Sequence, residues 1–481
     1  IAFCGQPASL STTRTSTTTG LVDCSKDVQT YSSSSMMPSA LSSAKDYIVP
    51  LPESETVQRD MKSLSSWATS NGVSFDKVLL EHQTSQTEPG KSSNHDSDED
   101  DWTLVLPQDT KEDIIILQVP SHLILSSERI RDELGDSLEQ AEEFLTKKKV
   151  QTEIPQFRIF VKLLLEYSKG PDESVWYPWM KSLPRSFNTA VCMDNVEMDC
   201  LPPFAWALAT VERLHLDLFR QALRIVPDSL FTDKRSITDN AELTCWVFNC
   251  VFTRCWRYPD AINGKQRCDI VPLGDMFNHN SNQNIEVDYD KEDNVCFTLR
   301  QDLPAGSPLS LSYGLATNPH RFLVIFGFVD ESQPEIFCQI LSNEPSEKLV
   351  EMGYDSSKMV FRTEDGAISN AVWDVMMYNL LEQVPKIQDA FYKAHKMNDK
   401  STKAAIHSRF HLEAALLLRK HVNNSVSECQ QLLEKANGYD STKHPRLPLI
   451  RKHLKFLVET FVKVRHTLDE TIQSETASRK Q

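Results

Sequence analysis

Strand-like and helix-like patterns follow one another along this sequence in large blocks, and this order constrains the fold more than any other feature. Short apolar runs typical of strands occur within residues 102–120, where "WTLVL" and "DIIILQVP" flank a polar turn as in a hairpin, and again within residues 296–314. Between these blocks, residues 127–245 carry mostly helical spacing, as in "FAWALATVERLHLDLFRQALRIV". The pattern predicts an α+β protein whose β core is interrupted by a helical insertion.

The two ends of the sequence differ in character. Residues 331–481 are dominated by helical patterns, the last over Ile450–Leu468, and are expected to form an all-helical domain. Residues 1–45 hold 18 Ser or Thr, which predicts a disordered tail or a transit peptide. Residues 46–101 are expected to form short helices followed by an acidic disordered loop. A plastid and a cytoplasmic location both stay open, and because the sequence begins with Ile, we expect its natural start to lie upstream.

Composition argues against several classes of function. A net charge of -16 is unfavourable for binding a phosphate backbone. The longest apolar runs, such as "FLVIFGFV", are far shorter than the roughly 20 residues of a membrane-spanning helix. The eleven cysteines include no CxxC pair, so the sequence predicts reduced thiols and neither a metal site nor a disulfide framework. We expect a soluble monomer with no nucleic-acid partner and no membrane span.

Polar residues follow an apolar run in "LGDMFNHNSNQN", which contains Asp275, Asn278 and His279. A buried amide or imidazole costs free energy unless it is paired, so a binding partner is expected there. Two further polar residues accompany this motif: Arg254 at the end of a predicted helix in "RCWRY", and Tyr313 at the end of a predicted strand in "LSLSYG". Taken singly, Arg254 could be a surface ion pair, Asp275 an Asx turn and Tyr313 a core ring with a hydrated hydroxyl.

The order and spacing of these segments, with "VIFGFVD" after them, resemble those of SET domains in the subgroup that includes the Rubisco large-subunit lysine methyltransferases and the actin-histidine methyltransferase. The resemblance extends over residues 102 to about 470. It implies a SET-type β core over residues 102–330, with the helical insertion inside it. It also implies that residues 331–481 are similar to the helical domain with which this subgroup binds a protein substrate.

The same resemblance implies a binding site for S-adenosylmethionine. Asn278 and His279 would lie at this site with their polar groups facing the cofactor, and Trp102 would also lie there. Arg254, with Thr253 beside it, would reach the cofactor's carboxylate through charge-assisted hydrogen bonds.

The implied reaction is methyl transfer to a protein lysine, or to a histidine. Because this is an in-line displacement, catalysis consists mainly of alignment. Tyr313 would stand at the channel where the substrate meets the methyl group, and Asp275 would line the substrate side. The attacking amine must be neutral, and a dry channel beside a sulfonium lowers the pKa of a lysine from about 10.4. No metal is required.

Two positions depart from the family pattern. SET domains open with a Gly-x-Gly stretch that lets the backbone approach the cofactor closely, and the matching residues are Asp101 and Thr103. Phe326 stands where the plant lysine enzymes have a tyrosine. The sequence therefore leaves two functions open: an active protein methyltransferase, and a catalytically inactive SET protein that only binds protein partners.

Overall fold

The computed structural model describes residues 59–82, 102–259, 266–314, 317–337, 347–354 and 358–479. The tail predicted over residues 1–45 and the acidic loop predicted over residues 83–100 lie outside these ranges. Within them, no helix combines the length and the apolar character needed to cross a membrane. The same ranges contain no group of three or more His, Cys, Asp or Glu residues that could hold a metal ion.

Short strands arranged in small sheets form the β core. Two sheets have three strands, in the orders β3–β9–β8 and β4–β6–β5, and the pairs β1–β2 and β7–β10 complete it. The strands are β1 (Leu79–His82), β2 (Trp102–Val105), β3 (Ile115–Val119), β4 (Leu125–Ser126), β5 (Trp256–Pro259), β6 (Gln266–Ile270), β7 (Asn278–His279), β8 (Ile285–Tyr289), β9 (Val295–Leu299) and β10 (Ser310–Leu311). The β7–β10 pair is parallel, whereas the other pairs of this core are antiparallel. Strands from both blocks of the sequence thus meet in one core.

Two predictions for the first strands are wrong. The hairpin does not form, because β2 pairs with β1 and β3 pairs with β9. The polar turn between them instead reaches a distant loop, where the backbones of Thr110 and Leu303 exchange hydrogen bonds of 2.9 Å. A second short helix was expected after α1 (Met61–Ser70), but the chain forms β1 there. Apolar alternation identifies a strand without identifying its partner.

Helices fill the predicted insertion and continue to Arg254. They are α2 (Ser127–Leu134), α3 (Asp136–Lys147), α4 (Ile154–Lys169), α5 (Tyr177–Ser182), α6 (Asn195–Met198), α7 (Pro203–Ile225), α8 (Lys234–Thr238) and α9 (Ala241–Arg254). Buried aromatic rings join α4, α7 and α9: the centroid of Phe219 lies 5.2 Å from that of Phe157 and 5.7 Å from that of Phe248. This packing places the last turn of α9 against the β core.

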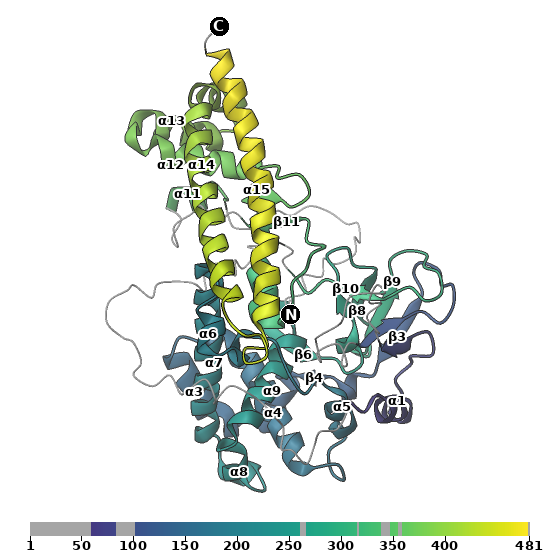
Figure 1. Cartoon of the computed structure of the whole chain (residues 1–481). Helices are drawn as coiled ribbons and strands as arrows, with labels where there is room; N and C mark the ends of the chain where they lie inside the picture. The colour runs from purple at the N-terminus through teal and green to yellow at the C-terminus, as the bar shows by residue number, and fades with distance from the viewer. Residues whose placement is uncertain are drawn as a thin grey trace.

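Helices also dominate the chain after residue 331. They are α11 (Glu347–Glu351), α12 (Asn370–Leu380), α13 (Pro385–Lys396), α14 (Lys400–Asn437) and α15 (Leu447–Ser478). The last helix extends at both ends beyond the predicted Ile450–Leu468. α14 and α15 lie side by side and project away from the β core (Figure 1).

This C-terminal region is not all-helical, which corrects the prediction. β11 (Glu335–Phe337) and β12 (Val360–Arg362) form an antiparallel pair that buries Ile336 and Phe361. Each strand has only three residues, which is too short for a period of two to be recognised in a helix-rich region.

Candidate functional site

The motif around Asn278 forms the parallel pair β7–β10. Asn278 lies opposite Ser310, and His279 lies opposite Leu311. Because β10 ends two residues before Tyr313, this pairing brings the two polar motifs of the sequence together. The grouping of Asn278, His279 and Tyr313 at one edge of the core is therefore a feature of the fold.

Both ring nitrogens of His279 bind groups of the protein. Nδ1 accepts a hydrogen bond of 3.0 Å from the backbone N–H of Tyr313, and Nε2 lies 3.0 Å from Oδ2 of Asp330. Since Nδ1 faces a donor, the geometry assigns the proton to Nε2. The polar groups of His279 therefore face the protein, whereas we expected them to face the cofactor.

Asp330 is a site residue that sequence reasoning missed. Burial opposes its charge, but hydrogen bonds from His279, Ser332 and Ser281 outweigh burial and lower the pKa of the Asp330 carboxyl to about 2. Asp330 stands in "VIFGFVD", yet it is 51 positions away from the histidine that it holds. No local pattern in the sequence indicates that the chain comes back to His279 at this residue.

A cluster of aromatic rings surrounds Tyr313, and we call it the ring cluster. Neighbouring centroids in it are 4.6 to 6.2 Å apart, and its members are His279, Tyr313, Phe322, Phe326 and Phe328. Phe326, which replaces the tyrosine of the family pattern, lies 5.3 Å from Tyr313. The wall of the ring cluster is therefore apolar at that position.

The hydroxyl of Tyr313 donates a hydrogen bond of 2.5 Å to the backbone carbonyl of Phe277. Removal from water raises the pKa of Tyr313 above its usual value of 10.0. The side chain is thus a protonated phenol near neutral pH, and its hydroxyl is not simply hydrated.

Phe322 and Phe326 lie on a π-helix, η10 (Phe322–Phe326), which ends at Gly327. Gly327 has a φ of +76°, and a Cβ there would lie 2.8 Å from the carbonyl carbon of Asn188. Both the left-handed backbone and the close approach require glycine. This contact sets η10 against the segment that leads into the short helix η7 (Ala190–Cys192).

Arg254 and Asp275 form a buried ion pair. Nη1 of Arg254 lies 3.1 Å from Oδ2 of Asp275 and donates at 2.8 Å to its backbone carbonyl, and the indole of Trp179 donates to the same carboxylate at 3.2 Å. Burial raises the pKa of Asp275, while Arg254 and Trp179 oppose that shift. Nε of Arg254 and Oδ1 of Asp275 are buried and have no hydrogen-bond partner among the residues that the structure describes.

This pair corrects the role expected for Asp275. Its side chain has 0% exposure, so it does not line an open channel on the substrate side. Asp275 instead holds the guanidinium of Arg254, whose own side chain is only 11% exposed. Neither a surface ion pair nor an Asx turn describes these residues.

The remaining predicted cofactor residues are partly brought together. The side chain of Asn278 is exposed and donates at 3.2 Å to the backbone carbonyl of Trp102, so β2 approaches β7. The hydroxyl of Thr253 donates at 2.7 Å to the carbonyl of Asn249, one turn earlier in α9. Thr103, at one of the two missing glycine positions, is buried in β2, and Asp101 lies outside the described residues.

In sequence, the chain is similar to known protein methyltransferases. No protein-family model matches the chain. Over 271 residues it is 23% identical to the actin-histidine N-methyltransferase of Rattus norvegicus and 24% identical to that of Gallus gallus. These matches cover 55% of this chain but only 41% and 42% of the two relatives, so the matched region spans about two fifths of their length.

Solved structures of Rubisco LSMT superpose on most of the chain. The structure bound to sinefungin and monomethyllysine gives a TM-score of 0.57, and the structure bound to AdoMet gives 0.55. Each covers 87% of this chain and 93% of the other, at 14% identity. A third, of the SET domain of LSMT bound to lysine and AdoHcy, gives 0.56. The chain has the SET fold.

Within the SET fold, the residues of the ring cluster come from three parts of the chain: β7, the turn after β10, and η10 with the residues that follow it. The Arg254–Asp275 pair comes from α9 and from η9 (Gly274–Met276).

Asn284 fixes the register of β10, because its side chain donates to the carbonyl of Pro308 and accepts from the N–H of Ser310, both at 2.9 Å. The predicted SET-type core with its helical insertion is confirmed.

Proposed function

We propose that this chain is an S-adenosylmethionine-dependent protein methyltransferase whose target is a lysine side chain. The observation that carries the proposal is the ring cluster around Tyr313 beside the exposed amide of Asn278, in a SET fold. Two comparisons support it: the sequence relatives are actin-histidine N-methyltransferases, and the solved neighbours are Rubisco LSMT structures with AdoMet or related ligands.

The residues present fit a cofactor that carries a carboxylate and an amine. A guanidinium has five N–H donors, and Asp275 engages only Nη1 of Arg254 in the hydrogen bonds described above. Nε of Arg254 is buried, and no described part of the chain supplies a hydrogen-bond partner for it, so a further acceptor suits it. Asn278 offers an exposed amide at the end of β7. We expect Arg254, Asn278 and the segment around Trp102 to hold the cofactor.

When bound, the cofactor supplies an electrophilic methyl group on a sulfonium. The chain supplies alignment and exclusion of water. The carbonyl of Phe277 fixes the ring of Tyr313, and His279 fixes its backbone N–H. Because the pKa of Tyr313 is raised, its phenol stays protonated and does not remove a proton from the substrate amine. The amine therefore arrives neutral, which apolar walls such as Phe326 favour.

Aromatic faces also suit the product. A methylated ammonium is a cation, and cations are stabilised over aromatic rings. This argument favours lysine over histidine as the target. The names of the sequence relatives favour histidine, and the assay below distinguishes the two. We further propose that the helical C-terminal region binds the protein substrate.

A catalytically inactive, protein-binding SET chain is the second candidate. It is favoured by Thr103, whose side chain is buried where the family pattern has glycine. Calorimetry with S-adenosylmethionine separates the two functions, because the active chain binds the cofactor and the inactive one does not.

The replacement Tyr313→Phe tests the active site itself. It keeps the ring and removes the hydroxyl that holds the ring against Phe277. We expect methyl incorporation to fall by at least about tenfold while the Kd of the cofactor changes little, as for an interaction made chiefly in the transition state. The measurement is transfer of labelled methyl groups into a whole-cell protein extract, followed by separation of methyl-lysine from methyl-histidine.

Tyr289→Phe is the matched control for this test. It removes a partly buried hydroxyl that donates to Asp269 at 2.7 Å in the β core, outside both the ring cluster and the C-terminal region. Methyl incorporation by this control variant should equal that by the natural chain. Equal incorporation by Tyr313→Phe would remove Tyr313 from the site, and absent cofactor binding would establish the inactive candidate.

A further inference from the structure

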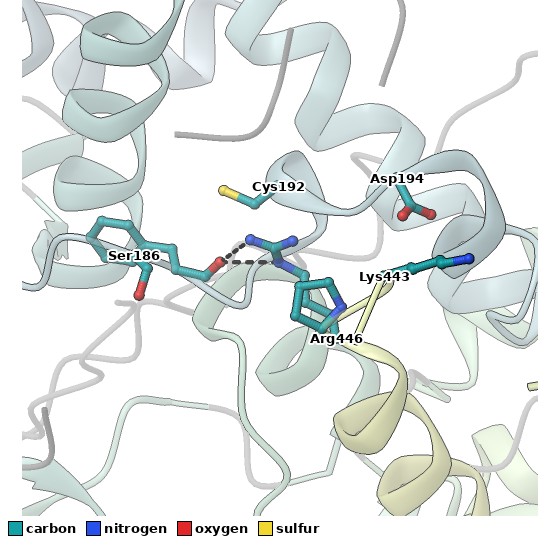
Figure 2. Close-up of a pocket in the computed structure, with 7 residues that line it drawn as sticks. Ser186, Cys192, Asp194, Lys443 and Arg446 are labelled. Atoms are coloured by element: carbon teal, nitrogen blue, oxygen red, sulfur yellow. Dashed lines mark hydrogen bonds between the residues drawn. The ribbon is translucent and has the colours of Figure 1, made fainter. Parts of the chain in front are cut away.

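A cavity of about 180 Å³ lies between the helical insertion and the turn that joins α14 to α15 (Figure 2). Cys192 of η7 lines one wall, and Lys443 and Arg446 of the turn line the other. No residue of the ring cluster or of the Arg254–Asp275 pair lines this cavity. It is therefore a site separate from the one proposed for methyl transfer.

Cys192 has a second thiol beside it. The thiol of Cys245, in α9, donates a hydrogen bond to the sulfur of Cys192. The side-chain nitrogen of Asn249 donates to both sulfurs, at 3.4 Å to Cys192 and at 3.6 Å to Cys245. Two cysteines far apart in the sequence are thus in contact at the edge of a cavity.

The charged groups around Cys192 favour a thiolate. Arg446 is held by two hydrogen bonds to the carbonyl of Phe187, at 2.9 and 3.1 Å, and Figure 2 shows its guanidinium beneath Cys192. Of the neighbouring carboxylates, Asp194 lies 2.5 Å from His444. Glu197 faces Arg446 itself: it accepts from the backbone N–H at 2.7 Å, and its Oε2 lies 3.8 Å from Nη1 of the guanidinium. A second guanidinium, that of Arg213, hydrogen-bonds the backbone of η7 at Ala190.

Cys192 also differs from other buried cysteines in its acidity. The hydrogen bond from Cys245 outweighs burial, and together with the charge of Arg446 it lowers the pKa of Cys192 below its usual value of 9.0. Burial instead raises the pKa of Cys250 and of Cys268 to about 12. At neutral pH, a thiolate is the reactive form of cysteine.

We propose that Cys192 is an oxidant-sensing nucleophile, that Cys245 is its resolving thiol, and that hydrogen peroxide reaches the pair through the cavity. The Cys192 thiolate attacks one peroxide oxygen, the O–O bond breaks, and the leaving hydroxide takes up a proton to become water. Cys192 is then a sulfenic acid. The Cys245 sulfur attacks the Cys192 sulfur, the S–O bond breaks, and the hydroxyl leaves as water with the Cys245 proton. The resulting disulfide joins η7 to α9, the helix that ends at Arg254.

The test uses the full chain with Cys4, Cys24 and Cys338 replaced by serine, because these three lie outside the described residues. Alkylation by iodoacetamide is followed for each cysteine by peptide mass spectrometry. At pH 7.5, Cys192 should react at least about tenfold faster than Cys250 or Cys268. Its rate should rise with pH by about tenfold per pH unit at acidic pH and become constant at a lower pH than the rates of Cys250 and Cys268, since only the thiolate reacts.

Treatment with hydrogen peroxide should abolish alkylation of Cys192 and Cys245 together. A linked Cys192–Cys245 peptide should then appear, and dithiothreitol should remove it. These readouts come from the unsubstituted pair, so they do not depend on whether a variant folds. Cys245→Ser should stop the reaction at a sulfenic acid that dimedone traps on Cys192, whereas the control Cys250→Ser should still give the linked peptide. Reaction of Cys192 no faster than that of Cys250, or oxidation without the linked peptide, would overturn the proposal.

Discussion

The carboxylate of Asp330 holds His279 in one tautomer, and this hydrogen bond makes the folded protein sensitive to acid. The pKa of Asp330 is about 2 in the folded chain, against an ordinary value of 3.8. Folding therefore favours the charged form, which contributes stability above about pH 4 that is lost as the pH falls towards 2. Each unit of pKa difference corresponds to about 1.4 kcal/mol, so the contribution at neutral pH is about 2 kcal/mol.

Asp330→Asn should remove this contribution. We expect the free energy of unfolding at pH 7 to fall by about 2 kcal/mol, and the difference from the natural chain to shrink as the pH approaches 2. Urea unfolding at several pH values measures both effects. Asp302→Asn is the control, because Asp302 pairs with Lys111 at the surface and such pairs contribute little. An equal loss at pH 7 in both variants would contradict the role of Asp330.

Single residues of the site could be identified from the sequence only where a motif carries them. Asn278, Arg254 and Tyr313 were predicted as site residues because the order of three motifs is characteristic of SET domains, and the pairing of β7 with β10 brings Asn278 and Tyr313 to one edge of the core. The burial of Asp275 against Arg254 could not be predicted, because it depends on Trp179, which belongs to the distant helix α5. Asp275 was therefore expected on the substrate side. For the same reason, the two hydrogen bonds that turn His279 towards the protein could not be predicted.

At the scale of elements, the π-helix η10 and the glycine that ends it position two rings of the cluster. A π-helix is frequent at functional sites, and this one ends in a left-handed residue in close contact with Asn188.

The sequence predicted that strands exist near residues 102–120 and 296–314, because alternation is local. It did not predict that β3 pairs with β9, because pairing depends on contacts between distant segments.

Gly327→Ala tests the positioning of η10. The change forces an L-residue into a left-handed backbone and also places a Cβ 2.8 Å from the carbonyl carbon of Asn188. Gly306→Ala is the matched control, since its φ is +77° and no atom of the described ranges lies within 4 Å of the added Cβ. We expect Gly306→Ala to cost about 1 kcal/mol of unfolding free energy and Gly327→Ala to cost at least about 2 kcal/mol more. Equal losses in urea unfolding would show that the contact with Asn188 has no effect.

At the scale of the whole molecule, a pair of buried histidines connects the SET core to the C-terminal helices. Nε2 of His453, in α15, lies 3.0 Å from Nδ1 of His320, in α10 (Pro319–Arg321). Burial lowers the pKa of His320 to about 3 and lowers that of His453 well below 6.5. The order of β core, insertion and helical region was predictable because apolar residues recur with a different spacing in strands and in helices. A contact between two regions, such as this histidine pair, leaves no such spacing in the sequence.

These histidines predict a dependence of stability on pH. Both are neutral in the folded chain, whereas in the unfolded chain they take up protons near pH 6.5. Stability is therefore complete above pH 6.5 and declines as the pH falls, by up to about 1.4 kcal/mol per unit for each histidine. His453→Gln should reduce the slope of unfolding free energy between pH 6.5 and 5, and His466→Gln, at an exposed position of α15, should leave it unchanged. Identical slopes in the natural chain and His453→Gln would contradict this account.

The C-terminal helical pair has a mechanical consequence. α15 has 32 residues, which at 1.5 Å per residue makes it about 48 Å long. Its base is held by Arg446 and His453, while α12 and α13 lie near the far end (Figure 1). A rotation of about 5° at the base moves the far end by about 4 Å over this length. A protein that binds the far end would therefore act through a long lever arm. A small force applied there would produce a large torque at Arg446 and His453 at the base.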